Sequence, residues 1–391
     1  MVANNCSHLS FTVLVGLLLA FSSLPCSQGV KPYKMNHPRP PLLANSDENG
    51  DPVPVQTAHK DAKLDPANFI VVLVAALVLI YAAYRALHPP YLDVGAMTPT
   101  QAAEYNEALE AGEMHLHTSL LFVIVASLAL VLIFYFMSAM AVLITVLFSL
   151  ISSLALGALV YPYVEQWTDH RFSNEVDVPL LGPIPMLVFV LAPFCFLVVF
   201  GWLVTKSWIL NNILAISLIV FFLTSIRLSS LMVASALLIL AFFYDIFWVF
   251  LSSAFFGKNV MVTVATGLDV PIKILVPLVL SSGAAGEMQF TLIGLGDIVL
   301  PGLLLCFALR FDAAKGADQT RSYFACCMAG YCVGLTICEI VVGSFHLAQP
   351  AMIYLVPGTL VPFAVLASMR GELQEAWDGL KSDTHAPIPD V

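Results

Sequence analysis

Residues 292–302 read LIGLGDIVLPG, in which Asp297 stands behind two glycines in the middle of an apolar run. The run has the composition of a membrane-spanning helix. A carboxylate at the centre of a bilayer costs about 2.5 kcal/mol or more on insertion scales. Acidic residues inside membrane spans are therefore rare, and each one is a candidate functional site.

The composition of the whole chain agrees with a membrane setting. Apolar residues make up 59% of the 391 residues and charged residues 11%, against about 25% charged residues in typical globular domains. A mean hydropathy of +0.89 predicts an all-α polytopic protein in the lipid bilayer, because a helix satisfies its own backbone in lipid. No basic stripe indicates nucleic acid as a partner. The eight cysteines lack the spacing of metal ligands, and we expect no metal and no other cofactor.

The apolar and polar segments divide the chain into four parts. SFTVLVGLLLAFSSL (10–24) predicts a signal peptide over 1–28, with an additional membrane helix as the alternative. Residues 29–67 are polar and proline-rich and are expected to form a lumenal tail. A membrane domain follows at 68–369, and then a cytosolic tail at 370–391. The domain is predicted to hold nine spans of sufficient length, at 68–88, 116–137, 139–162, 183–204, 208–226, 229–252, 289–309, 322–345 and 350–369.

The basic residues predict the orientation of these spans. With a lumenal N-terminus, eight lysines and arginines fall in cytosolic loops and the cytosolic tail, and three fall in the lumenal loops. This distribution follows the positive-inside rule. The five basic residues of the N-terminal tail oppose it, and a translocated signal peptide would override them.

The connection between the sixth and seventh predicted spans contains a candidate strand. NVMVTVA (259–265) has β-branched residues in partial alternation, which favours a short strand. A strand edge beside a membrane cavity could accept an extended peptide by β-addition. A re-entrant or surface loop is the alternative, and the pattern does not decide between them.

Three acidic residues fall inside predicted spans: Asp245, Asp297 and Glu339. Spans six and seven run antiparallel, with Asp245 about seven residues before the end of one and Asp297 about eight after the start of the other. At about 1.5 Å per residue, both carboxylates lie on the order of 10 Å from the same face. They can meet if the two helices pack side by side. Glu339 lies near the lumenal end of span eight and is expected at the interface.

Two carboxylates at one depth in a low-dielectric site share one proton, which provides an acid and a base in the same pocket. This is the chemistry of an aspartyl protease, in which water is activated without a covalent intermediate. The chain contains neither H-E-x-x-H nor G-x-S-x-G, the motifs of zinc proteases and serine hydrolases. A proton-coupled transporter using the same aspartates remains an alternative, as does a catalytically idle module that binds membrane segments.

Three motifs resemble those of the GxGD intramembrane aspartyl proteases, the presenilins and signal peptide peptidases. These are YD at Tyr244 and Asp245, GLGD at 294–297, and QPAM at 349–352, which resembles the family's QPAL. NVMVTVA…PIK and LGDIVLPG…LRFD look closer to signal peptide peptidase itself than to its paralogues or to presenilin. The order of the motifs and their host spans match the family.

The resemblance implies a presenilin-like fold and makes Asp245 and Asp297 the catalytic pair. The remaining motif residues would surround the active site and the substrate: Tyr244, Gly294, Leu295, Gly296, Gln349, Pro350, Ala351 and Met352. Gly294 and Gly296 are expected to loosen the helix and to admit another backbone closely. Met352 stands where the family has leucine, a change of similar volume.

The resemblance also implies the partners and the location. The substrates would be type II-oriented transmembrane segments, chiefly signal-peptide remnants, cut within the bilayer without a metal. Residence in the endoplasmic reticulum membrane is expected. The C-terminus, SDTHAPIPDV, lacks a dilysine retrieval signal, which leaves another endomembrane open. A homo-oligomer is compatible with the sequence, which does not give the oligomeric state.

Overall fold

The computed structural model describes residues 31–32, 66–87, 112–168, 172, 174–178, 182–257, 260, 270–282, 288–316, 322–345 and 349–379. The predicted signal peptide lies outside these residues. So do the candidate strand NVMVTVA, apart from Val260, and most of the predicted N-terminal tail.

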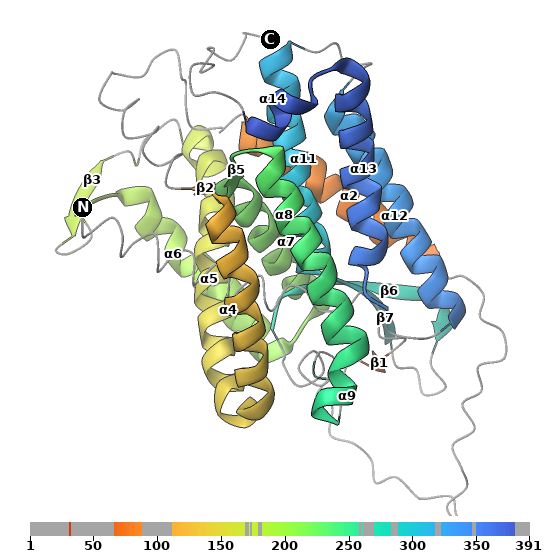
Figure 1. Ribbon diagram of the computed structural model, residues 1–391. Helices are drawn as coiled ribbons and strands as arrows, with labels where there is room; N and C mark the ends of the chain where they lie inside the picture. Colours follow the sequence, from red (N-terminus) through yellow and green to blue (C-terminus); the bar gives the residue numbers. More distant parts are fainter. Residues whose placement is uncertain are drawn as a thin grey trace, which may run out of the picture.

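Helices dominate the described chain (Figure 1). The long ones are α2 (Pro66–Leu87), α4 (Leu116–Tyr135), α5 (Met137–Trp167), α6 (Met186–Thr205), α7 (Trp208–Ser225), α8 (Leu231–Ile246), α11 (Leu295–Lys315), α12 (Tyr323–Phe345) and α13 (Met352–Arg370). A π-helical turn, Phe247–Leu251, joins α8 to α9 (Ser252–Phe256), and a short helix α14 (Leu373–Asp378) follows α13.

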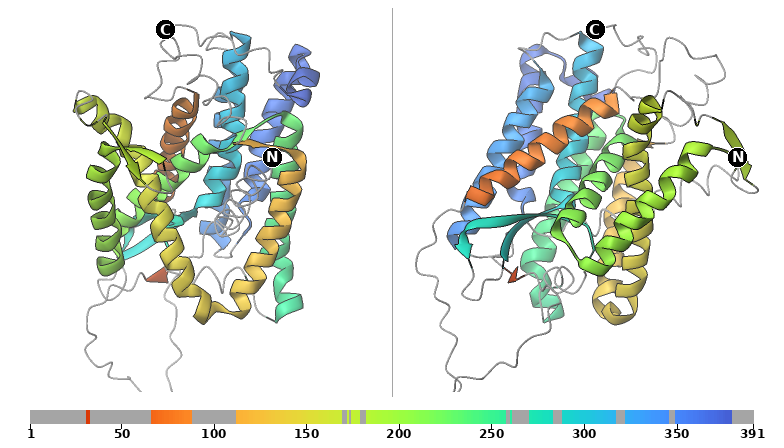
Figure 2. Two further views of the ribbon diagram at one scale, coloured as in Figure 1. Left: turned by 90° about the vertical axis from the view of Figure 1, so that its left-hand side faces the viewer. Right: turned by 180° about the vertical axis from the view of Figure 1, so that it is seen from behind.

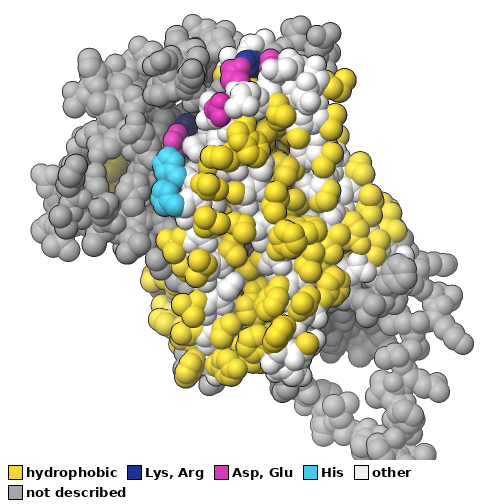
Figure 3. Space-filling model, in the orientation of Figure 1, with side chains coloured by type: hydrophobic (Ala, Val, Ile, Leu, Met, Phe, Trp, Pro, Cys, Tyr) yellow, Lys and Arg dark blue, Asp and Glu magenta, His cyan; other side chains and the backbone are white. Residues whose placement is uncertain are grey.

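Eight segments of the described chain are long and apolar enough to cross a membrane: Pro66–Leu87, Leu116–Tyr135, Met140–Trp167, Met186–Thr205, Trp208–Ser225, Leu231–Phe256, Tyr323–Ser344 and Met352–Arg370. Their outer faces carry exposed large apolar side chains such as Leu128 and Leu154. Figure 3 shows apolar side chains over much of the flank seen in that view, with charged side chains gathered at the end where α14 lies. A large exposed apolar surface marks contact with a membrane or with another protein; together with the eight candidate spans it identifies a multi-pass membrane protein.

The helix that carries Asp297, α11, runs through the middle of the bundle (Figures 1 and 2). Seventeen of its 21 residues are buried, and it packs against α2, α7, α8, α12 and α13. A Cβ on Gly302 would lie 2.6 Å from Leu79 Cδ2 and 3.0 Å from Leu223 Cδ2, which shows how tightly α2 and α7 enclose it. α11 is therefore surrounded mainly by other helices of the protein and less by lipid.

The prediction of a seventh helical span over 289–309 is wrong at its N-terminal end. Residues 288–294 form a strand, and α11 begins only at Leu295. The reason is that β6 (Lys273–Ser282) precedes this segment and pairs with it as β7 (Met288–Gly294). An apolar run of this length does not by itself distinguish a strand from a helix.

The β-structure beside α11 is a sheet of order β1-β7-β6. Lys273 pairs with Gly294 and Leu275 with Leu292, and the register shifts between Pro277 and Ser282. On the other edge of β7, β1 (Lys31–Pro32) pairs antiparallel at Phe290 and Gln289. Two further pairs of short strands occur in the described chain: β2 (Glu113–Met114) with β5 (Arg227–Leu228), and β3 (Glu175–Val178) with β4 (Gly182–Pro185).

Glycines allow α12 and α13 to pack backbone against backbone. A Cβ on Gly334 would lie 2.7 Å from the carbonyl oxygen of Tyr354, and a Cβ on Gly358 would lie 2.6 Å from that of Gly330. Gly330 and Gly334 are four residues apart, the small-xxx-small spacing of close helix contacts in membranes. Any larger side chain at these positions would separate the two helices.

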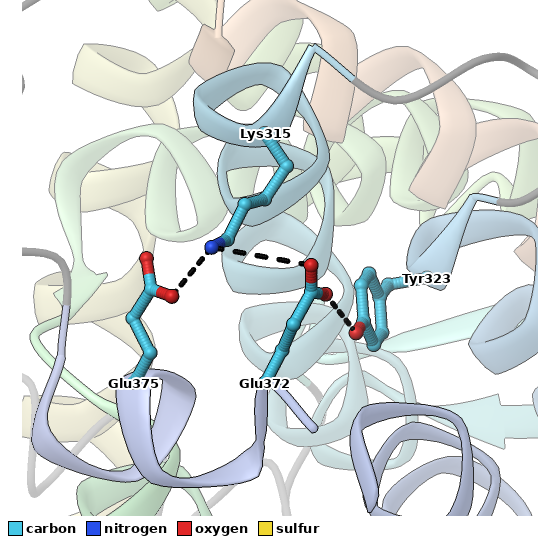
Figure 4. Close-up of polar contacts among 4 residues, drawn as sticks. All are labelled: Lys315, Tyr323, Glu372 and Glu375. Atoms are coloured by element: carbon cyan, nitrogen blue, oxygen red, sulfur yellow. Dashed lines mark hydrogen bonds and ion pairs between the residues drawn. The ribbon is translucent and has the colours of Figure 1, made fainter. Parts of the chain in front are cut away.

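The chain after α13 folds back onto the bundle, whereas the sequence predicts only a cytosolic tail there. Lys315 Nζ donates to Glu375 Oε2 at 2.5 Å and lies 4.0 Å from Glu372 Oε1. Glu372 Oε2 also accepts a hydrogen bond from the Tyr323 hydroxyl at 2.5 Å (Figure 4). These contacts join α14 to the ends of α11 and α12. Residues 380–391 lie outside the described chain.

Asp312 of α11 caps the next long helix, α12. Its carboxylate accepts hydrogen bonds from Tyr323 N at 2.8 Å, Phe324 N at 2.9 Å and Ser322 Oγ at 2.5 Å. The first N–H groups of a helix have no partner within the helix. A buried carboxylate that satisfies two of them stabilises the start of α12.

We expect Asp312→Ala to lower the free energy of unfolding by about 2 kcal/mol, because it removes a buried helix cap. Lys315→Met should cost less than about 1 kcal/mol, because exposed ion pairs contribute little. Thermal unfolding in detergent micelles measures both. Equal losses in the two variants would show that Asp312 does not act as a cap.

Candidate active site

Two buried aspartates lie on neighbouring helices at the centre of the bundle. Asp245 near the end of α8 and Asp297 in the first turn of α11 are each 2% exposed. α8 and α11 are in contact, so the two buried carboxylates lie on helices that pack against each other. The structure therefore brings together the two acids that the sequence pairs by depth.

The backbone around Asp297 holds its carboxylate at a helix N-terminus. Gly294 is the N-cap of α11, in an extended conformation (φ −69°, ψ 147°), so Asp297 is the third residue of the helix. The Asp297 carbonyl oxygen accepts a hydrogen bond from the Tyr331 hydroxyl at 3.3 Å. A carboxylate in the first turn is stabilised by the helix dipole.

The GLGD glycines do not loosen the interior of a helix, which corrects the prediction from sequence. Gly294 ends β7, and α11 starts at the next residue. Gly296 lies buried in the first turn. The transition from strand to helix, rather than a weakened helix, is what the motif provides.

Asp245 is held by the third motif. The N–H of Met352, the first residue of α13, donates to Asp245 Oδ2 at 3.2 Å. This N–H is one of the donors that a helix leaves free at its N-terminus. Ala351 and Met352 are buried, with exposed fractions of 0% and 1%, and Pro350 is also buried. The QPAM turn thus lies directly against the aspartate pair.

The other motif residues lie at different distances from the pair. Leu295 is buried, and its N–H donates to Ile272 O at 2.9 Å, which ties the start of α11 to β6. Gln349 Oε1 instead accepts a hydrogen bond from the Tyr354 hydroxyl at 2.7 Å. Gln349 therefore supports the first turn of α13.

Tyr244 lies in a small apolar crevice next to Asp245. Four helices contribute to it: α4, α8, α11 and α13. The lining residues are Phe122, Val123, Ala126, Ala241, Tyr244, Leu300 and Met352. Tyr244 precedes Asp245 in the chain, and the N–H of Met352 donates to the Asp245 carboxylate. The crevice therefore borders the aspartate pair.

Each aspartate presents one oxygen without a hydrogen-bond partner in the described chain, Asp245 Oδ1 and Asp297 Oδ2. Buried polar atoms are nearly always hydrogen-bonded, and exceptions in native structures concentrate at functional sites. Asp245 Oδ2 is fixed by the N–H of Met352, and Asp245 Oδ1 and Asp297 Oδ2 remain available. This arrangement can hold and transfer a proton and can bind water. No group of three or more side chains suited to a metal ion occurs in the described ranges.

Glu339 lies in the interior, which corrects its predicted position at the interface. It is 3% exposed, on α12, which packs against α11. The prediction from sequence relied on distance from the helix end alone. In the structure, the first turn of α2 covers this end of α12: a Cβ on Gly343 would lie 3.5 Å from Asn68 Nδ2. The feature of the sequence that pointed to Glu339 was the presence of an acidic residue inside a predicted span.

Comparisons with known proteins agree with these features. The Signal peptide peptidase family model matches residues 106–383. The chain is 35% identical over 293 residues to signal peptide peptidase-like 3 of Oryza sativa subsp. japonica, covering 73% of this chain and 56% of that protein. It is 32% identical over 361 residues to signal peptide peptidase-like 1 of the same organism, covering 81% of this chain and 94% of that protein. It is 34% identical over 280 residues to signal peptide peptidase-like 3 of Arabidopsis thaliana, covering 68% of this chain and 51% of that protein.

The chain spans about half the length of two of these relatives and nearly all of the third. All three carry signal peptide peptidase-like names, so the finer placement closer to signal peptide peptidase itself stays a prediction. The matches give no support to a transporter. Because the family model covers most of the chain, the protein belongs to the signal peptide peptidase family.

Proposed function

We propose that the protein is an intramembrane aspartyl endopeptidase that cleaves transmembrane segments with Asp245 and Asp297. The observation that carries this proposal is the buried pair itself: each carboxylate has an oxygen without a hydrogen-bond partner in the described chain, and the N–H of Met352 fixes the other oxygen of Asp245. Family membership supports the same activity.

The reaction is hydrolysis, with one proton shared by the pair. The ionised carboxylate takes a proton from water, and the resulting oxygen attacks the carbonyl carbon of the peptide bond. The protonated carboxyl gives its proton to the carbonyl oxygen, which forms a tetrahedral diol. The C–N bond then breaks as the amine takes a proton and the diol becomes a carboxylic acid. The low-dielectric surroundings strengthen each of these electrostatic interactions.

The substrate must present an extended backbone, because a peptide bond inside a helix is shielded. The sheet next to Asp297 offers a way to hold such a backbone. The outer edge of β7 pairs antiparallel with β1 at Gln289 and Phe290, and the same strand continues through Gly294 to the first turn of α11. β-Addition of the unwound substrate to residues 291–294, beyond the two residues that pair with β1, would carry it toward the aspartates.

The substrate class and the location are part of the proposal. The substrates are type II-oriented segments such as signal-peptide remnants, and the membrane is that of the endoplasmic reticulum or another endomembrane. The N-terminus is lumenal and the C-terminus cytosolic, which the eight basic residues on the cytosolic side against three in lumenal loops support. Residues 1–28 act as a signal peptide, and residues 68–369 form the protease domain.

Labelling with a photoreactive transition-state analogue of aspartyl proteases tests the proposal. Such analogues bind far more tightly than substrates to a site complementary to the transition state. Wild-type protein in detergent should be labelled, and Asp297→Ala should not. If folded wild-type protein binds a membrane-embedded peptide but takes no label and releases no fragment, the protein is a binding module instead.

A further inference from the structure

Two adjacent asparagines near the start of α7, Asn211 and Asn212, lie in the otherwise apolar run WILNNILAI. Asn211 is only 4% exposed. A buried amide without a hydrogen bond costs free energy, so the positions of these side chains depend on what they bind. Both of them bind the backbone of β6.

The hydrogen bonds cover two alternate residues of the strand. Asn211 Nδ2 donates to Lys273 O at 2.7 Å. Asn212 Nδ2 donates to Leu275 O at 2.7 Å, and Asn212 Oδ1 accepts from Leu275 N at 2.8 Å. The Asn212 amide therefore makes the same pair of bonds that a peptide group of a neighbouring strand would make.

These bonds lie on the edge of β6 that faces away from β7. In an antiparallel strand, the N–H and C=O of one residue point to the same side, and the next residue points to the other. Leu275 directs both groups to Asn212, so Ile274 and Val276 face β7, where they pair with Ile293 and Thr291. The amides of α7 occupy the outer edge where an additional strand could otherwise pair.

The same short stretch of β6 holds the backbone that precedes Asp297. Lys273 pairs with Gly294, and Ile272 O accepts a hydrogen bond from Leu295 N at 2.9 Å. Residues 272–275 thus lie between the amides of α7 and the first residue of α11. A continuous series of hydrogen bonds connects Asn212 through β6 to the turn that carries Asp297.

We infer that Asn212, assisted by Asn211, is a positioning residue for Asp297. It fixes β6 against α7, and β6 in turn fixes the first turn of α11. The same contact closes the outer edge of β6 to strand addition, which leaves residues 291–294 of β7, beyond the pairing with β1, for an extended substrate. This inference rests on the proposed protease function for its effect on catalysis, although the hydrogen-bond path is independent of it.

Asn212→Leu tests the inference, because leucine has a similar size and cannot bond to Leu275. A displacement of about 1 Å at a catalytic group can cost on the order of 100-fold in rate. We expect kcat for a membrane-embedded reporter peptide to fall by about 10- to 100-fold, with KM near that of wild type. Asn212→Gln keeps an amide and should recover part of kcat. Ser217→Ala is the matched control, because the buried Ser217 hydroxyl bonds within α7 to Ile213 O at 2.7 Å.

Hydrogen–deuterium exchange provides a readout that does not need activity. In Asn212→Leu, amides of residues 273–276 and 288–297 should exchange faster than in wild type, and in Ser217→Ala they should not. Unchanged exchange over 288–297, or unchanged kcat in an active enzyme, would overturn the positioning role. If the wild type itself cleaves nothing, the proposed function fails, and the exchange pattern still decides whether Asn212 holds the start of α11.

Discussion

Asp297→Asn is expected to abolish cleavage of a membrane-embedded reporter peptide, lowering turnover by about 10³-fold or more. Asparagine has nearly the same shape as aspartate, but it can neither accept the proton of water nor share a proton with Asp245. Asp245→Asn should have the same effect, and the double variant should be no worse than either single one, because the two groups act as a unit. Fragment release from the purified protein in liposomes measures all three.

The controls come from other buried acids of the chain. Asp312→Asn changes an aspartate on the same helix, 7% exposed, whose carboxylate caps α12; it should keep cleavage close to wild type. Glu339→Gln tests the third acid near Asp297, and it should retain most of the turnover if the pair is Asp245 and Asp297. Cleavage by either folded single variant of the pair, or total loss only in Glu339→Gln, would mean that the wrong acids were assigned.

Gly330→Ala is expected to destabilise the protein by about 1–3 kcal/mol, the usual cost of overpacking. A Cβ at this position would overlap the carbonyl oxygen of Gly358 on α13, and backbone atoms cannot move aside as a flexible side chain can. Because α13 begins with Met352, whose N–H donates to Asp245, separating α12 from α13 should also reduce turnover. The midpoint of thermal unfolding and the cleavage rate in the same detergent measure the two effects.

Gly157→Ala is the matched control for this substitution. Gly157 lies within α5, where a Cβ would be 3.7 Å from Cys195 Sγ, an ordinary contact distance. Alanine favours the helix over glycine by about 1 kcal/mol, so this variant should be as stable as wild type or more so. If both alanine variants unfold at the wild-type temperature, the contact between α12 and α13 is not limiting for stability.

The membrane helices and the two aspartates could be predicted from the sequence for a direct physical reason. Spans such as 116–137 and 208–226 follow from composition, because lipid allows few structures other than helices for a continuous apolar segment. Asp245 and Asp297 stand out because a carboxylate in such a segment is costly. Neither inference depends on which residues lie beside each other in space.

The sheet and its supports could not be predicted in this way. The segment 288–294 is apolar enough for a helix, and only its pairing with β6 makes it a strand. Asn211 and Asn212 gain a role only when α7 brings their amides to the β6 backbone. Glu339 is buried because α12 packs against α2, α11 and α13 in the folded bundle.

That the chain crosses the membrane several times, and which acids to consider, therefore follow from the sequence, because both depend on the cost of transferring groups from water to lipid. The tertiary structure alone decided how those acids are held: Asp245 by the N–H of Met352, and Asp297 by the strand-to-helix turn at Gly294. Hydrogen bonds between residues far apart in the chain form only once the helices have packed, and no local pattern encodes them.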